Sequence, residues 1–280
     1  MIKLLKKLEP FIEEGLSGAA SISACETLNA NLKLGIEALG TGRIRAIWRS
    51  EDGCYHANES VKRLILAYFK TGKNEPFNIS RLSDGFDCIQ LRYKTGDELY
   101  LQQHGIRIVP GAIVREGAFL GKNTVMMPSF VNIGAYISEG TMVDTWATIG
   151  SCAQVGKRVH ISGGVGIGGV LEPIGAQPVI IEDDVFIGAR SEVAEGVIIR
   201  RGAVLSMGVY IGKSTPIVDA KTGKKWIGYI PENAVVVPGA IDVYGTGIST
   251  YAAVVKKYAD DSTRSKLKLD DTFRGEARSL

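Results

Sequence analysis

The stretch VDTWATIGSCAQVGKRVHISGGVGIGG, residues 143–169, carries an aliphatic residue at every sixth position. An amphipathic helix repeats its apolar face about every 3.6 residues and a half-buried strand about every two, so neither explains this period. The period extends in both directions and gives eighteen hexads in three runs. Their first positions are Ile113, Phe119, Val125, Val131, Ile137, Val143, Ile149, Val155, Ile161 and Ile167, then Ile181, Ile187, Val193, Ile199, Leu205 and Ile211, and finally Ile230 and Val236.

Most hexads also have a small or β-branched residue at the fifth position, such as Ala147 and Val165. Because side chains alternate along a strand, the fifth and first positions point one way, and the sixth and second positions point the other. We therefore predict that each hexad forms a very short strand and a corner, and that the coils stack into a β-solenoid around an aliphatic core. A glycine-rich β-sandwich with accidental spacing is the competing interpretation. Eighteen hexads with aliphatic residues at all but one first position disfavour it.

The points where the period begins and ends divide the chain into three parts. Before it lie two helical stretches, CETLNANLKLGIEALGTG and NESVKRLILAYFKTG, and a hairpin that turns at Asp52 and Gly53. After it, STYAAVVKKYA predicts a strand, and the charged tail has room for a short helix. The predicted domains are a mostly helical α/β domain at 1–105, the solenoid at 106–243 with excursions at 173–180 and 213–229, and a small C-terminal extension at 244–280.

Composition favours a soluble, cytoplasmic protein without a nucleic-acid or membrane partner. The charge is nearly balanced, with 33 Lys and Arg against 30 Asp and Glu, so there is no basic footprint for nucleic acid. The N-terminal stretch MIKLLKKLEPFIEE carries charges throughout and lacks the apolar run of a signal peptide or a membrane span. The four cysteines are scattered without a CxxC pair, which is typical of free thiols in a reducing compartment.

Two carboxylates occupy outward positions of the repeat, where side chains are free for chemistry. Asp144 holds the second position of its hexad and Glu192 the sixth. Outward carboxylates are usually only solvated, but Trp146 accompanies the first, and Arg190 and Ser191 precede the second. This clustering weighs against a non-catalytic scaffold, which stays open as an alternative.

Four motifs carry a specific resemblance. MVDTWATIGSCAQVGKRVHISGGVGIGGVLEP, MPSFVNIGAY, IEDDVFIGARSEV and VLSMGVYIG resemble the signatures of the tetrahydrodipicolinate N-succinyltransferases, within the hexapeptide-repeat acyltransferases. The resemblance is strong from about residue 105 to 240 and weak outside. It implies a mainly β fold, a left-handed parallel β-helix with three hexads per turn. It also implies a homotrimer that uses succinyl-CoA as co-substrate, with no permanently bound cofactor and no metal.

The resemblance also implies roles for individual residues. Arg107, in GIRIVP, and Asp144 match positions that contact the dicarboxylic substrate, and Glu192 matches a second carboxylate near the reacting amine. A guanidinium can bind a carboxylate through two parallel hydrogen bonds, and a carboxylate can accept the proton that an attacking amine loses. Asp144 and Glu192 are therefore the predicted catalytic residues. His160, also at an outward position, is the rival base, and a hydrogen-bonding role at a subunit contact is its alternative.

The CoA site is predicted from glycines and small residues. The run SGGVGIGGV, residues 162–170, does not introduce a helix as a phosphate loop does, so it favours close approach of a backbone or of a pantetheine arm. Neighbouring coils could offer backbone groups to that arm, and lysines near the second excursion could meet the CoA phosphates, although a solvated hairpin at KTGK explains Lys224 and Lys225 equally well. The predicted contacts are Gly188, Ala189, Ser206, Gly208 and Lys213.

Three further expectations concern the alternatives and the assembly. An acetyl-CoA-dependent transferase on the same or another small amine is the runner-up activity. A zinc carbonic anhydrase needs three His ligands on the coils, but two of the three histidines, His56 and His104, precede the first hexad. Two coils and four residues along the strand would separate Asp144 from Glu192 by roughly 16 Å in one chain, which places the predicted active sites between subunits.

Overall fold

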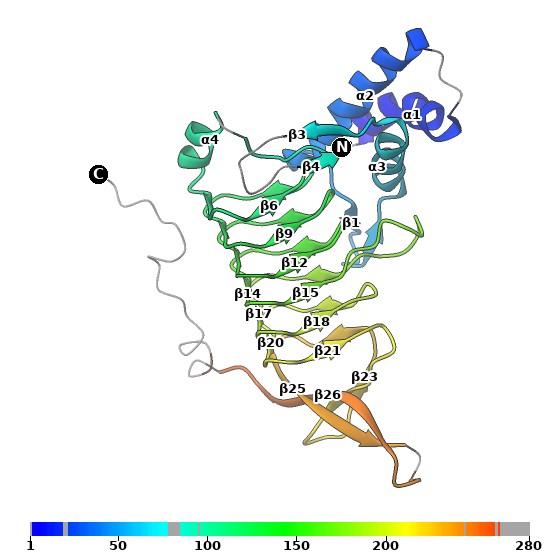
Figure 1. Ribbon diagram of the computed structural model, residues 1–280. Helices are drawn as coiled ribbons and strands as arrows, with labels where there is room; N and C mark the ends of the chain where they lie inside the picture. Colours follow the sequence, from blue (N-terminus) through cyan, green and yellow to red (C-terminus); the bar gives the residue numbers. More distant parts are fainter. Residues whose placement is uncertain are drawn as a thin grey trace.

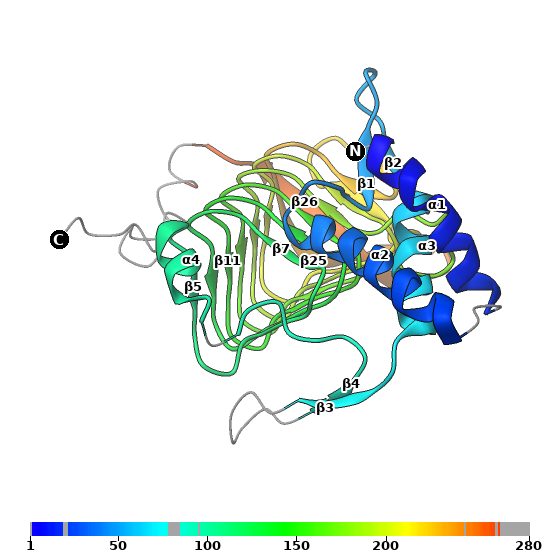
Figure 2. The same cartoon turned by 90° about the horizontal axis from the view of Figure 1, so that it is seen from above.

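The computed structural model describes residues 2–18, 22–77, 85–94, 96–243, 245–260 and 263. A three-sided stack of coils forms the centre of the molecule, with helices at one end and a long β-hairpin at the other (Figure 1). Seen along the stack, the coils superimpose into one prism, with α1 and α3 to one side of it and α2 reaching from that side over its end (Figure 2). The predicted solenoid is confirmed.

The prism has three parallel sheets, one on each side. The first sheet holds β5 (Arg107–Ile108), β8 (Val125–Met126), β11 (Met142–Val143), β14 (His160–Ile161), β17 (Phe186–Ile187), β20 (Val204–Leu205) and the start of β25 (Ala234–Asp242). The second holds β6 (Ile113–Val114), β9 (Phe130–Val131), β12 (Thr148–Ile149), β15 (Gly166–Ile167), β18 (Glu192–Val193) and β21 (Tyr210–Ile211). The third holds β7 (Phe119–Leu120), β10 (Tyr136–Ile137), β13 (Gln154–Val155), β16 (Ile180–Ile181), β19 (Ile198–Ile199) and β24 (Tyr229–Ile230).

Three hexads make one coil, as the resemblance implied. Val143 on β11 pairs with Ile161 on β14, three hexads later in the sequence. From Val131 onward the predicted first positions are buried in one continuous core, together with fifth positions such as Ala147 and Val165. Burying one such aliphatic side chain contributes about 1.5–3 kcal/mol, so the column of first positions is the main source of stability in the prism.

The predicted register is wrong in the first three hexads. Val114, Leu120 and Met126 point into the core, one residue later than the predicted Ile113, Phe119 and Val125.

The cause of this shift is a shortened corner between β8 and β9. In a regular corner, the residue at the fourth position of the hexad has a positive φ, as Trp146 has (φ 61°). The corner after Met126 is one residue shorter and contains Pro128, whose ring fixes a negative φ. The residue that carries the positive φ in other corners is therefore the one missing here.

Two excursions leave the prism close to the predicted places. Between β15 and β16 the chain departs after Val170, whose N–H still donates to the Ser151 carbonyl at 3.1 Å, and it rejoins the ladder at Val179, whose carbonyl accepts from the Gln154 backbone N–H at 3.0 Å. The loop thus begins and ends somewhat earlier than the expected 173–180. Lys62, fully buried on α3 (Glu59–Thr71), anchors it by donating to the backbone carbonyls of Pro173 and Ala176. The second excursion contains the hairpin expected at KTGK, formed by β22 (Ile217–Asp219) and β23 (Lys225–Trp226).

The N-terminal domain is mostly helical, as predicted, and is packed firmly against the prism. Its elements are α1 (Ile2–Ser17), α2 (Ile22–Gly40), the hairpin β1 (Ile47–Arg49) and β2 (Tyr55–Ala57), α3, the pair β3 (Glu75–Phe77) and β4 (Gly85–Asp87), and α4 (Glu98–Gln103). The core of the three-helix bundle includes Ile133 and Cys152 from prism corners.

None of the helices in the described part of the chain has the length and apolar character needed to cross a bilayer.

The C-terminal extension starts inside the predicted solenoid. Val235 and Val236 pair with β20 as the last rung, and β25 then continues into an antiparallel hairpin with β26 (Ser249–Tyr258). The strand expected at STYAAVVKKYA is therefore confirmed. The short helix expected in the tail lies outside the described residues, apart from residue 263.

The corrected register predicts an order of stability losses. Leu120→Ala should lower the free energy of unfolding by about 2–5 kcal/mol, because the side chain is buried in the prism. Ile113→Ala should cost clearly less, because Ile113 is only partly buried and points outward. Denaturant unfolding followed by circular dichroism measures both losses. An equal or larger loss for Ile113→Ala would restore the register expected from the sequence.

Candidate active site

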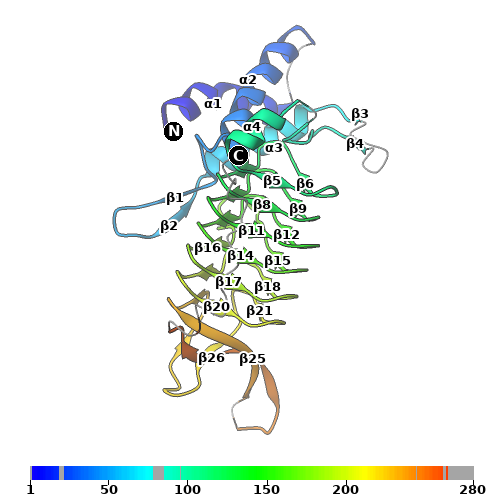
Figure 3. The ribbon, with the colours of Figure 1, turned by 90° about the vertical axis from the view of Figure 1, so that its left-hand side faces the viewer.

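The candidate site lies along one corner of the prism, where the first sheet turns into the second (Figure 3). We call it the first corner and define it by residues 127–129, 144–147, 162–165, 188–191 and 206–209. Successive coils stack here through backbone hydrogen bonds, including Gly164 N–H to the Thr145 carbonyl at 2.8 Å and Arg190 N–H to the Gly163 carbonyl at 3.1 Å. Asp144, Trp146, Arg190 and Glu192 therefore lie on or directly beside one continuous edge.

Asp144 is held in one orientation by its neighbour. Its backbone N–H donates to the Ile161 carbonyl at 2.9 Å, which continues the ladder beyond β11. Its Oδ1 accepts hydrogen bonds from the Thr145 N–H at 2.6 Å and from the Thr145 hydroxyl at 3.2 Å. Oδ2 accepts none from the described residues, so one oxygen is fixed and the other is available to a substrate.

Glu192 lies past the corner, at the start of β18, and its side chain bends back over the preceding coil. Gly166 is its partner in the ladder, and a Cβ placed on Gly166 would lie 1.9 Å from Oε2 of Glu192. The carboxylate thus occupies the space that a side chain at residue 166 would fill. Partial desolvation in this position raises the pKa of Glu192. The Glu192 carboxylate makes no ion pair or hydrogen bond with the residues that the structure describes, whereas its backbone N–H donates to the Val209 carbonyl at 2.9 Å.

Arg190 repeats this arrangement at the corner itself. A Cβ on Gly164 would lie 2.6 Å from Nη1 of Arg190, so the guanidinium extends over Gly164 toward the coil that carries Trp146. Trp146 is 71% exposed and Arg190 is exposed as well. Two glycines in one coil therefore create a recess that receives a cation and an anion from the next coil.

This geometry corrects the expected separation of the two carboxylates. The hexads beginning at Val143 and Ile187 do lie on one sheet, two coils apart. Glu192, however, belongs to the second sheet, because the chain turns the first corner before reaching it. Its carboxylate also leans one coil, about 4.8 Å, toward the level of Asp144. The estimate of roughly 16 Å assumed a straight strand, and that assumption is wrong because the chain turns a corner between Asp144 and Glu192.

Arg107 and His160 lie on the outer face of the first sheet, near Asp144. Arg107 on β5 is exposed and is two strands from β11, about 10 Å at the usual strand spacing. His160 is the ladder partner of Met142, on the strand next to Asp144. Its ring stacks on Phe186 with 4.9 Å between centroids. The structure thus brings Arg107, His160 and Asp144 to one face, and the choice between His160 and the carboxylates as base stays open.

Four of the five predicted CoA contacts share the first corner with Asp144. Gly188, Ala189, Ser206 and Gly208 lie on two adjacent coils, where the Gly208 N–H donates to the Ala189 carbonyl at 3.0 Å. The N–H groups of Gly188, Ser206 and Gly208 are already bonded within the chain. The Ala189 N–H donates to none of the described residues and is the available donor among these four.

Lys213 is separated from this group. It follows β21, at the corner where the chain leaves the second sheet rather than where it enters that sheet from the first corner. There its N–H donates to the Glu195 carboxylate at 2.8 Å. Lys224 lies in the β22–β23 hairpin with its Nζ 5.2 Å from the Trp226 ring. The solvated-hairpin interpretation therefore fits Lys224, and neither lysine lies on the first corner.

The glycine run has two functions that the sequence did not separate. Gly168 and Gly169 allow close approach of backbone, as expected, since a Cβ on Gly169 would lie 2.1 Å from the Ser151 nitrogen. Gly164 and Gly166 instead make room for side chains of the next coil. The position of Arg190 over Gly164 was not predicted from the sequence. The signal that could have found it is a glycine at the matching position one coil earlier.

The chain is similar to known N-succinyltransferases over nearly its whole length. A family profile described as "Hexapeptide repeat of succinyl-transferase" matches residues 178–213. A 2,3,4,5-tetrahydropyridine-2,6-dicarboxylate N-succinyltransferase of Polynucleobacter asymbioticus is 47% identical over 270 residues, which is 95% of this chain and 98% of the relative. Its counterpart in Rhodopseudomonas palustris is 49% identical over 281 residues, covering 96% and 99%. The chain belongs to this family.

A solved structure supports the fold. A Campylobacter jejuni protein described as a 2,3,4,5-tetrahydropyridine-2-carboxylate N-succinyltransferase superimposes with a TM-score of 0.53 at 18% identity. The match covers 81% of this chain and 62% of that one. Within the N-succinyltransferase family, the left-handed parallel β-helix expected from the motifs is confirmed.

The recess gives a test of Glu192 that leaves Glu192 itself unchanged. Gly166→Ala is compatible with the backbone, but the new Cβ must displace the carboxylate. We expect kcat/KM for acyl transfer to fall about 10²-fold, since a displacement of about 1 Å can cost that much. Steady-state kinetics measure the effect. The matched control is Gly163→Ala, whose Cβ would meet only the Thr145 carbonyl oxygen at 3.4 Å. Equal activities of the two variants, both folded, would remove the position of Glu192 from the mechanism.

Proposed function

We propose that this chain transfers a succinyl group from succinyl-CoA to the amine of ring-opened, hydrated tetrahydrodipicolinate. The product is N-succinyl-2-amino-6-oxopimelate, an intermediate of the diaminopimelate route to lysine. Membership of the N-succinyltransferase family supports the reaction. The structural observation that supports succinyl transfer is the pair of oriented carboxylates, Asp144 and Glu192, beside the guanidinium of Arg190 on the first corner.

The chemistry needs a base and an anion-binding group. The amine nitrogen attacks the thioester carbonyl carbon, the N–C bond forms, and the C–S bond breaks. The amine loses one proton to a carboxylate, and the departing CoA sulfur gains one. Desolvation raises the pKa of Glu192, which makes it a stronger base than an ordinary carboxylate and suits it to accept that proton. Asp144, fixed through Thr145, is suited to hold the amine in line for attack.

The acceptor is a dicarboxylate, so it needs cations at both ends of its binding site. Arg107 on the outer face of the first sheet and Arg190 on the first corner flank Asp144 from two directions. Each guanidinium can bind one carboxylate through two hydrogen bonds. The Ala189 N–H is the proposed backbone donor to the pantetheine arm. Gly188, Ser206 and Gly208 have small or no side chains and would allow the arm to approach the backbone closely. Lys213, on the far side of the second sheet, would meet only the distal phosphates of CoA.

We further propose a cytoplasmic homotrimer in which neighbouring prisms complete the sites. Trp146 and Met207 are each 71% exposed on the first corner, and large apolar side chains of this kind are enriched where subunits meet. A closed ring of three identical contacts would give three equivalent sites. The acyl donor is the one co-substrate that this function requires.

The first test compares donors. Release of free CoA thiol, measured with tetrahydrodipicolinate and either succinyl-CoA or acetyl-CoA, should show a clear preference for succinyl-CoA in kcat/KM. The same measurement without acceptor gives the hydrolysis background. A preference for acetyl-CoA would establish the runner-up, an N-acetyltransferase, and no turnover with either donor would leave the scaffold interpretation.

The second test locates the carboxylates within the assembly. Asp144→Asn and Glu192→Gln should each lose about 10²- to 10⁴-fold in rate, as expected for a lost base or steering group. If Asp144 of one chain acts with Glu192 of its neighbour, equal mixing of the two variants should restore about a quarter of normal activity, because one contact in four then joins two intact groups. Sites built within single chains would stay inactive at every mixing ratio.

A further inference from the structure

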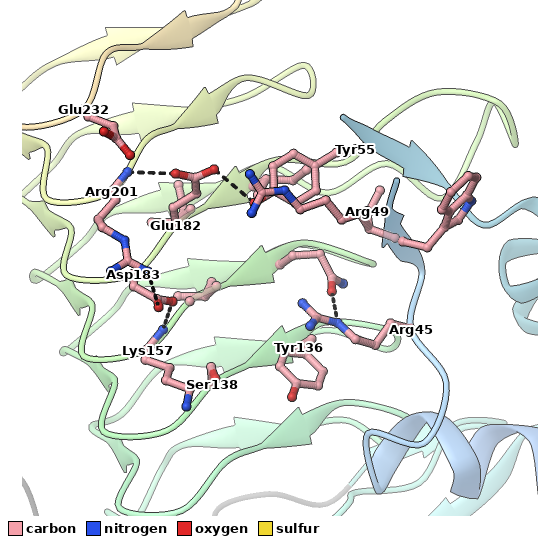
Figure 4. A pocket seen from close by; sticks show the side chains of 17 residues that line it. Arg45, Arg49, Tyr55, Tyr136, Ser138, Lys157, Glu182, Asp183, Arg201 and Glu232 are labelled. Atoms are coloured by element: carbon pink, nitrogen blue, oxygen red, sulfur yellow. Dashed lines mark hydrogen bonds and ion pairs between the residues drawn. The ribbon is translucent and has the colours of Figure 1, made fainter. Parts of the chain in front are cut away.

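A second polar cavity lies on the opposite side of the prism from the first corner. It has a volume of about 420 Å³ and lies between the β1–β2 hairpin and the third sheet (Figure 4). Its floor is formed by β10, β13 and β16, and the hairpin with the segment leading into it supplies Arg45, Arg49 and Tyr55. This volume falls within the usual range for small-ligand sites, about 300–1,000 Å³. None of Asp144, Arg190 and Glu192 lines it.

Arg45 is the central cation of this cavity. Its guanidinium lies flat on the Tyr136 ring, 3.8 Å from the centroid, and its Nε donates to the Gln154 amide oxygen at 2.9 Å. Burial lowers the pKa of Arg45. No carboxylate among the described residues pairs with it, so four of its five N–H donors are available. In Figure 4 the terminal nitrogens face the open space of the cavity.

Arg49 adds a second guanidinium from the hairpin. Its Nε donates to the Gly53 carbonyl at 2.9 Å, and its Cζ lies 5.2 Å from the centre of the Tyr55 ring. It also makes no ion pair with the residues that the structure describes. Two guanidiniums held by aromatic rings and by one hydrogen bond each are thus positioned before any ligand arrives, which reduces the entropic cost of binding.

The carboxylates of the cavity do not neutralise these cations. Glu182 already accepts from the Tyr55 hydroxyl at 3.0 Å, from Arg200 at 2.8 Å and from the Arg201 N–H at 2.9 Å. Asp183 accepts from the Lys157 N–H at 2.8 Å and from Arg201 at 3.2 Å.

The cavity therefore keeps a small positive charge. Its cationic side chains are Arg45, Arg49, Lys157 and Arg201, and its carboxylates are Glu182, Asp183 and Glu232. Arg200 also pairs with Glu182, so the cations outnumber the carboxylates. The unpaired part of that charge lies on the guanidiniums of Arg45 and Arg49. A planar carboxylate matches the fork of a guanidinium through two parallel hydrogen bonds.

We propose that this cavity is a binding site for a small organic monocarboxylate, held by the guanidiniums of Arg45 and Arg49. The Tyr136 ring supports the first guanidinium, and the polar side chains of Ser138 and Gln154 lie along the wall for hydroxyl or amide groups of the ligand. Because the hairpin and the prism each supply part of the wall, a bound ligand would tie the N-terminal domain to the third sheet. The proposal does not depend on the reaction proposed for the first corner.

The three tryptophans allow a direct test in the full-length protein. Trp48 lines the cavity, Trp146 lies on the first corner, and Trp226 lies on β23. In fluorotryptophan-labelled protein, assigned with Trp48→Phe, titration with acetate and with L-lactate should shift the Trp48 fluorine resonance saturably. A dissociation constant of about 1 mM or below is expected. The Trp146 resonance should not follow the same curve.

The variants decide whether Arg45 carries the binding. Arg45→Gln should weaken acetate binding at least about tenfold, since it removes a charge-assisted bidentate contact. Arg43→Gln, on the same segment but exposed and outside the cavity, is the matched control and should leave binding unchanged. If Arg45→Gln does not fold, Arg45→Lys keeps the charge but loses the fork, and it should weaken binding severalfold.

Three results would overturn the proposal. One is the absence of a saturable Trp48 shift up to about 10 mM carboxylate, well above the expected dissociation constant. Another is equal affinity in Arg45→Gln and the control. The third is inorganic phosphate binding at neutral pH as tightly as acetate, which would make the cavity a general anion site rather than a carboxylate site.

Discussion

The parallel backbone ladder between successive coils is the constraint on which the rest of this molecule depends. Nearly every strand of the prism has only two residues, such as Met142–Val143, and cannot be stable alone. Each strand is held because the coils on both sides pair with it and because its aliphatic residue stacks in the common core. Residues at equal positions are therefore kept one above another, about 4.8 Å apart, along the whole prism.

This stacking explains how the candidate site is made. When equivalent side chains are only about 4.8 Å apart, the space available to one is set by the residue one coil earlier. Glycine at 164 and 166 frees that space, and the side chains of Arg190 and Glu192 occupy it. The same recess partly desolvates the Glu192 carboxylate, which stays exposed on one side, and so raises its pKa. Position and basicity of the proposed base thus follow from two glycines that have no chemistry of their own.

The sequence predicted the features that depend on the period and failed on those that depend on a single corner or on packing between domains. The sixfold spacing was enough for a solenoid with an aliphatic core and for the outward direction of Asp144 and Glu192, whereas the three sides of the prism followed from the resemblance to the acyltransferases. It could not reveal the shortened corner at Pro128, because a fixed period continues past a one-residue deletion when both candidate positions are apolar, as in Phe119–Leu120. It could not pair Arg45 with Gln154 either, since contacts over 109 positions depend on how the N-terminal domain docks.

That docking decides which side of the prism is open. Ile133 and the Cys152 side chain point out of their corners and would face water in a bare prism, but they are buried in the helical bundle beside Ile65. Lys62 fixes the first excursion to the same bundle through two backbone carbonyls. With the bundle so placed, the β1–β2 hairpin reaches the third sheet, and Arg45 packs on Tyr136. The first corner receives no such cover from the residues that the structure describes, among which Trp146 stays exposed. The N-terminal domain therefore covers the face opposite the carboxylates, where the Arg45 cavity remains, and leaves the edge that carries Asp144 and Glu192 accessible among the described residues.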